Sequence, residues 1–235
     1  MKKYKNHTKK DLIEVYNLMY KSRKLDEKQL ILLKQGKGFF HIGASGHEAV
    51  QVAASKCFKT EKDYSYPYYR NQAYCLGLGM TSREILLSFL AKDSDPNSGG
   101  RQMPQHFGHK KLNIVSQSSP TGTQYLQATG AAFALNKNNE NGIVYVSSGE
   151  GTTSQGDFHE ALNWSSRVKA PVIFHIENNG YAISVPIDEQ TSGGSVYKIS
   201  SGYENLHRIK IDGTDYFESL IAFNSACDRA RKGLG

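Results

Sequence analysis

The sequence predicts an α/β fold in which a parallel β-sheet is covered by helices on both faces. Two short apolar and β-branched runs, residues 143–147 and 172–176, have the character of buried strands. A segment long enough for a helix separates them, as a crossover between parallel strands requires. The 235 residues are enough for one sizeable domain with its own hydrophobic core.

The first half of the chain is expected to be mainly helical. Apolar positions recur at helical spacing over residues 11–35, and glycines at positions 36 and 38 end the pattern. A second helix is expected over residues 47–58. Thr81, three residues before Glu84, forms a capping-box pattern, which predicts a third helix through about residue 91. Residues 93–100 then form a turn-rich loop.

The second half alternates helices with strands. Residues 124–136 are rich in alanine and leucine and predict a helix before the strand at 143–147. Residues 157–168 are the predicted crossover helix to the strand at 172–176. An alternating pattern predicts a further strand over residues 206–211, and residues 215–231 predict a final amphipathic helix. We divide the chain into a basic flexible tail, residues 1–10, and one domain, residues 11–235.

Composition excludes several classes of partner. The net charge is +7, but outside the tail basic residues alternate with acids and form no basic–aromatic stripe, so no nucleic-acid partner is expected. No apolar run approaches the ~18 residues of a membrane helix, and no targeting segment is recognised, so we expect no membrane partner and a cytoplasmic location. The lysines of the tail are Lys2, Lys3, Lys5, Lys9 and Lys10. The cysteines form no metal-spaced pair and are expected as small buried thiols; they are Cys57, Cys75 and Cys227.

Two motifs that follow the predicted strands together indicate a metal–diphosphate site. The glycine-rich residues 149–156 follow the first strand, and residues 177–181 follow the second, at the sheet edge where such folds bind ligands. Glycines let backbone N–H groups approach a phosphate, and a helix beginning near residue 155 would direct its positive end there. Glu150 and Asn179, 29 positions apart, offer the hard oxygen ligands that magnesium prefers.

Two other phosphate-binding patterns are missing. The glycine-rich stretch lacks the Gly-Lys-Ser/Thr ending of a Walker loop, and no Gly-x-Gly-x-x-Gly fingerprint follows the strand. This argues against an ATPase or a dinucleotide site. A nucleotide-dependent phosphotransferase stays an alternative, disfavoured by the missing lysine. An ordinary strand-to-helix turn would explain residues 149–156 alone, so the motif at 177–181 is what strengthens the prediction.

The two motifs resemble the thiamine diphosphate motif of the alpha subunit of 2-oxo acid dehydrogenases. Gly149-Glu150-Gly151 matches its Gly-Asp-Gly start, and Asn178-Asn179 matches its Asn-Asn end. Glutamate in place of aspartate, with Asn-Gly-Tyr-Ala-Ile-Ser over residues 179–184, is closer to the branched-chain (2-oxoisovalerate) type. Two positions depart from that type. Glu177 stands where the branched-chain type usually has Arg and the pyruvate type has Glu, so one cation beside the diphosphate is lost and the signature is mixed. Tyr68 stands where the branched-chain type usually has a polar amide. Other matches, across roughly residues 10–230, are Tyr69-Arg70, residues 100–104, Ser118-Ser119-Pro120, Thr123-Gln124 and residues 130–132.

The resemblance implies a set of ligands. Glu150, Asn179 and the backbone oxygen of Tyr181 would hold magnesium. The other cofactor-binding residues would be Tyr69, Arg70, Ser119, Thr121, Gly149, Gly151 and Thr152. Potassium would be bound by Ser118, Pro120, Thr123 and Gln124. Packing of a tyrosine-rich segment and an N-cap role for the polar turn are the plain alternatives, and His41 and His106 are as easily structural as functional.

The resemblance also implies a function. The protein would decarboxylate a branched-chain 2-oxo acid and reductively acylate a lipoyl group on an acyltransferase core. The glutamate that activates the pyrimidine ring would come from a beta subunit or a fused beta domain. We therefore expect no catalytic residue in this chain, and we expect the protein to work as a hetero-oligomer. In the family the last helix leads into a further strand and a histidine-bearing loop, so we expect the domain to be truncated at its C-terminal end. Alternatives are a pyruvate- or acetoin-type alpha subunit and a non-catalytic assembly subunit.

Overall fold

The computed structural model describes residues 7–116 and 119–235. At its centre lies a parallel sheet with the strand order β1-β2-β3. These strands are β1 (Tyr64–Tyr66), β2 (Val144–Gly149) and β3 (Val172–Glu177). Gly149 is paired with Glu177, so β2 and β3 end at the same edge of the sheet. The predicted α/β fold with a parallel sheet is confirmed.

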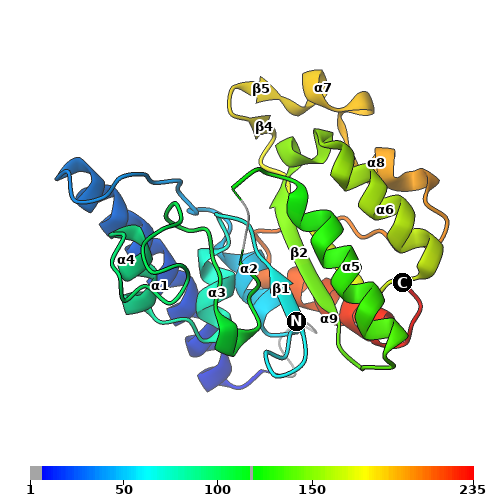
Figure 1. Ribbon diagram of the computed structural model, residues 1–235, viewed down its shortest axis with the longest axis horizontal. Coiled ribbons are helices and arrows are strands. Elements are labelled where there is room, and N and C mark those ends of the chain that lie inside the picture. Colours follow the sequence, from blue (N-terminus) through cyan, green and yellow to red (C-terminus); the bar gives the residue numbers. More distant parts are fainter. Residues whose placement is uncertain (1–6, 117–118) are drawn as a thin grey trace.

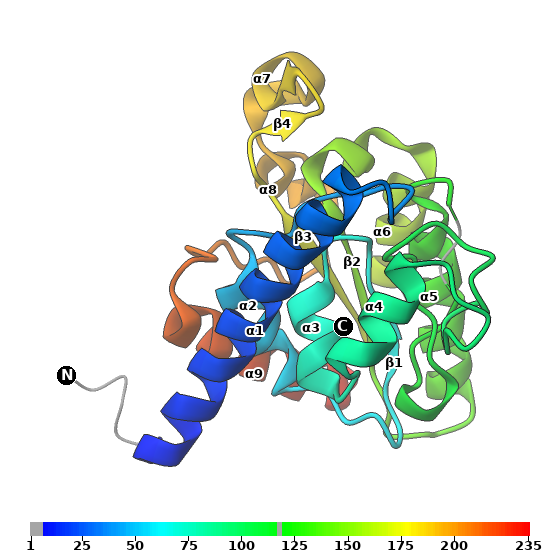
Figure 2. The same ribbon diagram turned by 90° about the vertical axis from the view of Figure 1, so that its left-hand side faces the viewer.

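Helices cover both faces of this sheet (Figure 1). One face packs against α5 and α6, and the other against α2, α3 and α9; α1 crosses the outer side of α2 and α3 (Figure 2). The helices are α1 (Lys9–Lys34), α2 (Glu48–Ser55), α3 (Gln72–Leu78), α4 (Ser82–Phe89), α5 (Thr123–Lys137), α6 (Gly156–Val168), α7 (Ile187–Gln190), α8 (Val196–Ile199) and α9 (Tyr216–Arg231). The six helices predicted from the sequence are all present.

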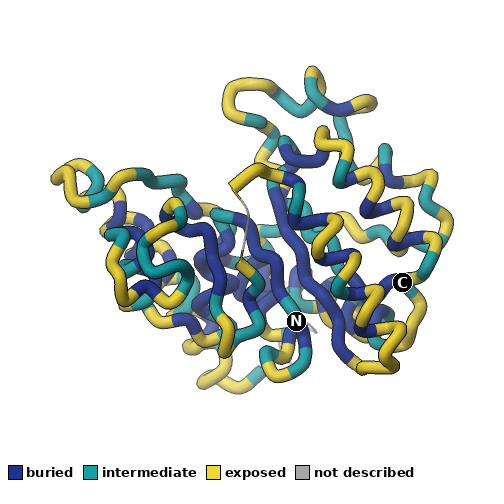
Figure 3. Tube along the Cα trace, in the orientation of Figure 1, coloured by how far each residue is buried: buried dark blue, intermediate teal, exposed yellow. Residues whose placement is uncertain are grey.

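Strand β2 buries side chains on both faces of the sheet, so helices must pack on both faces. Because side chains alternate along a strand, Val144 and Val146 enter the core formed with α5 and α6, whereas Tyr145 enters the core on the opposite face. There the rings of Tyr145 and Tyr74 are stacked with their centroids 4.1 Å apart. The strand is buried along nearly its whole length (Figure 3). A continuous apolar run is therefore the expected sequence of this strand.

Capping boxes start two of the helices. The Thr81 hydroxyl accepts a hydrogen bond from the Glu84 N–H at 3.2 Å, and the Glu84 carboxylate accepts one from the Thr81 N–H at 2.8 Å. This confirms the pattern predicted before α4. Thr8 caps α1 in the same way, so Lys9 and Lys10, which we assigned to the tail, belong to the helix. The other lysines of the tail lie outside the described residues.

Several short elements carry no signal in the sequence. The tyrosine-rich segment contains β1 and α3, and the chain after β3 forms a hairpin of β4 (Tyr181–Ala182) and β5 (Val185–Pro186) before α7 and α8. Elements of two to seven residues are too short for periodicity to reveal. All three cysteines are free, with Cys75 and Cys227 buried. Among the described helices, none combines the length and apolar character needed to span a membrane.

The strand predicted over residues 206–211 is wrong. The segment has irregular backbone, and a groove of about 850 Å³ lies between it, β3 and α9. Leu206 and Ile211 pack against the two core clusters, while Ile209 is 42% exposed. Partial burial thus accounts for Leu206 and Ile211 only. Such burial does not require the backbone to pair with a neighbouring strand.

Removing the Thr81 cap should weaken the protein. Thr81→Ala leaves the Glu84 N–H without its partner and should lower the free energy of unfolding by about 1 kcal/mol. Chemical denaturation measures this loss. Thr81→Ser keeps the hydroxyl and is the matched control, expected to retain parental stability; equal losses in both variants would contradict the capping role.

Candidate functional site

Glu150 and Asn179 meet at the edge where β2 and β3 end. Glu150 opens a 3-10 turn, Glu150–Ser154, and Asn179 lies in the loop after β3. The Asn179 N–H donates a hydrogen bond to Glu150 Oε2 at 3.1 Å. Glu150 is only 1% exposed, and no described residue donates a hydrogen bond to its other oxygen, Oε1. A buried carboxylate oxygen left without a donor is well suited to a cation.

The nearby oxygens suit magnesium. The side-chain oxygen of Asn179 accepts the Tyr181 N–H at 3.0 Å, which holds the loop in a tight turn. Gly180 has φ +88°, a conformation that favours glycine. Carboxylate, amide and carbonyl oxygens are the ligands of hard cations. The described residues contain no cluster of three or more His, Cys, Asp or Glu side chains able to hold a metal. Glu150, with its buried oxygen that lacks a donor, is the anchor of this candidate site.

The glycine-rich turn is held from outside by the chain after β5. Gln190 Nε2 donates to the carbonyl oxygens of Glu150 and Gly151, at 3.2 and 2.9 Å. A Cβ added to Gly151 would lie 2.8 Å from that of Ala182, so this position has no room for a side chain. Thr152 is nearly buried, and α6 begins only a few residues later. The N-terminus of α6 therefore follows the turn directly, as an anion site requires.

Arg70 lies in the loop after β1. Its guanidinium donates to the carbonyl oxygen of Gly43 and lies 5.5 Å from the centre of the Tyr69 ring. Tyr69 in turn stacks with His106, with ring centroids 6.5 Å apart. Tyr69 and Arg70 are half-buried, whereas His106 is 5% exposed. His41 contacts Asp26 at 3.2 Å and lies edge-on to the Phe89 ring, with centroids 6.1 Å apart.

In the polar turn before α5, residues 119–124, side-chain hydrogen bonds join residues of the turn to one another. Thr123 donates to the Pro120 carbonyl oxygen at 3.1 Å, and the Gln124 side-chain oxygen accepts the Gly122 N–H at 3.0 Å. Gly122 occupies the N-cap position without a capping side chain. Ser119 and Thr121 are exposed, and Ser118 lies outside the described residues. Three of the oxygens expected to bind potassium, those of Pro120, Thr123 and Gln124, thus already take part in hydrogen bonds within the turn.

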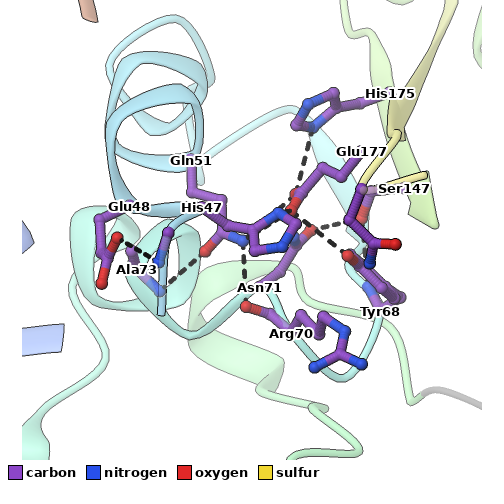
Figure 4. A network of polar contacts seen from close by, with 12 residues as sticks. His47, Glu48, Gln51, Tyr68, Arg70, Asn71, Ala73, Ser147, His175 and Glu177 are labelled. Atoms are coloured by element: carbon purple, nitrogen blue, oxygen red, sulfur yellow. Dashed lines mark hydrogen bonds and ion pairs between the residues drawn. The ribbon is translucent and has the colours of Figure 1, made fainter. Parts of the chain in front are cut away.

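A buried carboxylate that the sequence analysis did not assign to the site lies behind these loops. The side chain of Glu177 is 1% exposed and accepts hydrogen bonds from Gln51, Asn71 and Tyr68, at 2.9, 2.5 and 3.3 Å (Figure 4). His47 Nδ1 lies 2.6 Å from it. Glu177 thus points into the protein, and the expected loss of one cation beside the diphosphate stays a prediction. Its departure from the branched-chain pattern was the only signal in the sequence.

The charges in this cluster are balanced. Burial by itself disfavours ionised Glu177, but hydrogen bonds and the neighbouring histidines outweigh it and hold the pKa of Glu177 below its ordinary value. The hydrogen bond to Glu177 raises the pKa of His47. Burial lowers the pKa of His175, whose Nδ1 lies 3.7 Å from the same carboxylate. Both shifts favour the ion pair of Glu177 with His47 over the neutral pair.

Comparison with known proteins shows the family of this chain. The family model described as "Dehydrogenase E1 component" matches residues 16–235. The chain belongs to this family. This E1 chain is 42% identical over 228 residues to the 2-oxoisovalerate dehydrogenase subunit alpha of Bacillus subtilis (strain 168), covering 97% of its own length and 69% of the relative. The resemblance inferred from the two motifs is confirmed.

Other relatives include both types of alpha subunit. The chain is 34% identical to the mitochondrial 2-oxoisovalerate dehydrogenase subunit alpha of Caenorhabditis elegans and to the pyruvate dehydrogenase E1 component subunit alpha of Staphylococcus aureus (strain Mu50 / ATCC 700699). Each match covers 97% of this chain, but 51% and 58% of the relative, respectively. The E1 chain therefore spans between about half and about two thirds of the lengths of these curated relatives.

The pairing of His47 with Glu177 should make stability depend on pH. The pKa of His47 is raised from 6.5, so its contribution is fully present below about pH 6.5 and is lost as pH rises through the folded-state pKa. His47→Gln should cost about 2 kcal/mol at about pH 5.5 and progressively less above neutrality. Denaturant unfolding of both proteins across pH measures the difference. A difference independent of pH would contradict the ion pair.

Proposed function

We propose that this E1 chain binds magnesium and the diphosphate end of thiamine diphosphate where β2 and β3 end. The observation that carries the proposal is the buried, unpartnered oxygen of Glu150 next to Asn179. Such an oxygen is costly to leave unpaired in the interior. A cation bridging it to phosphate oxygens would remove that cost.

Each residue then has a defined part. Glu150, the side chain of Asn179 and the carbonyl oxygen of Tyr181 would hold magnesium. The backbone of Gly149, Gly151 and Thr152 and the fork of Arg70 would hold the diphosphate. Tyr69, Ser119 and Thr121 would line the rest of the cofactor. The bound cofactor would supply the nucleophilic carbon and the electron sink for decarboxylation.

For the substrate we propose a branched-chain 2-oxo acid. The relative at 42% identity is named for 2-oxoisovalerate, whereas the pyruvate-type relative is 34% identical. Glu177, the residue typical of the pyruvate type, lies in the interior and so argues little about which acyl chain is accepted. A pyruvate- or acetoin-type activity is the second candidate. A lipoyl group on an acyltransferase core would accept the acyl product.

We further propose that activity needs a beta partner. The carboxylates assigned here, Glu150 and Glu177, are committed to the cation site and to the buried cluster. As the family resemblance implies, the glutamate that activates the pyrimidine ring would come from a beta subunit or domain. A potassium site at the turn before α5 is a weaker part of the proposal, because Thr123 and Gln124 already bond within that turn.

Calorimetry tests the cofactor. The protein should bind thiamine diphosphate with magnesium more tightly than ATP with magnesium, and Glu150→Ala should weaken that binding by at least about 100-fold, because a direct metal ligand is lost. Glu160→Ala, the same change at an exposed position on α6, is the control and should bind like the parent. Preference for ATP would indicate a nucleotide enzyme instead.

A panel of 2-oxo acids tests substrate and partner. We expect decarboxylation and lipoyl reduction only when the chain is combined with a beta partner, with branched-chain acids turned over faster than pyruvate. Turnover by the chain alone would refute the half-site. A reconstituted complex that binds the cofactor but turns over no acid would favour the assembly subunit.

A further inference from the structure

A buried amide joins the loop of Arg70 to the strand that leads to Asn179. Gln51, on α2, is 1% exposed. Its Nε2 donates to the carbonyl oxygen of Arg70 at 3.0 Å and to the Glu177 carboxylate at 2.9 Å. Its Oε1 accepts the Ala73 N–H at 3.1 Å. One side chain thus bonds to three separate points of the chain.

The loop after β1 is tied to Glu177 by further bonds. Asn71 donates to the carboxylate at 2.5 Å, and the Tyr68 hydroxyl donates to it at 3.3 Å (Figure 4). The Tyr68 N–H also donates to the Ser147 hydroxyl of β2 at 3.1 Å. Residues 68–71 are therefore held against the ends of β2 and β3 on both sides of Arg70.

We propose that Gln51 and Glu177 are positioning residues of the cofactor site, which set Arg70 relative to the loop of Asn179. Both side chains are buried and contact one another, so they act through Arg70 and the end of β3, without touching the diphosphate. This inference rests on the proposed function. It also gives Glu177 a role in the site, beside the expected loss of a cation at its position.

The physical reason lies in how a guanidinium recognises a diphosphate. Two parallel N–H···O bonds form only when the fork has the correct position and plane. The Gly43 carbonyl holds the guanidinium of Arg70, while Gln51 holds its backbone. Without Gln51 the backbone of this loop can shift, and displacements of about 1 Å are costly in binding sites.

A double-mutant cycle in the complex reconstituted with a beta partner tests the role. The variants are Gln51→Met, which is similar in length but has no amide, Arg70→Lys, which keeps a charge but not the fork, and the pair. Calorimetry with thiamine diphosphate and magnesium gives the dissociation constants. Gln51→Met should weaken binding about 10-fold or more in the parent and clearly less in the Arg70→Lys background. Tyr68→Phe, a milder change to the same cluster, should weaken binding in the same direction.

Asp63→Asn is the matched control. Asp63 is also a buried carboxylate, paired with Arg231 at 2.6 Å, but it lies beside the start of β1, at the opposite end of the sheet. The Asp63→Asn change should lower the midpoint of thermal unfolding without changing the dissociation constant of thiamine diphosphate. Equal effects of Gln51→Met in both backgrounds, or lowered stability with unchanged binding, would overturn the positioning role alone. A parent complex that fails to bind thiamine diphosphate would overturn the proposed function together with it.

Discussion

The in-register pairing of β2 with β3 is the constraint on which the candidate site depends. Because Gly149 lies beside Glu177, the residues that follow the two strands leave the sheet at the same edge. Glu150 and Asn179 are then close enough for a hydrogen bond, although they are 29 residues apart. A register shift of one residue would exchange the faces of the strand and separate them. The helices on both faces keep this register by burying alternate side chains of β2.

Two buried carboxylates at this edge, Glu177 and Glu150, differ in how many of their oxygens have hydrogen-bond partners. Glu177 has its charge compensated by His47 and its oxygens bonded to amides and a hydroxyl, which is how a protein can bury an ion without a large penalty. Glu150 is equally buried but keeps one oxygen without a donor. A satisfied carboxylate fixes structure, whereas an unsatisfied one is prepared for a ligand. The difference in hydrogen-bond partners thus suits Glu177 to a structural role and Glu150 to ligand binding.

Membership of the E1 family places these carboxylates in context. The family match covers nearly the whole chain, and its relatives include alpha subunits named for branched-chain and for pyruvate substrates. Glu177 points into the protein, and its contacts are with residues that hold the loops of the site.

Much of this protein follows from local sequence. The apolar runs, the Thr81 cap and the helical periodicities determined six helices and two of the strands, and the motifs at 149–156 and 177–181 determined the family. Only the tertiary structure decided that Glu177 turns inward, that Gln51 bridges to Arg70, and that residues 206–211 stay unpaired. Periodicity reports the burial of one face, and it is silent about which distant residue covers that face. Gln51 and Glu177 are 126 residues apart, so their contact exists only once the chain has packed.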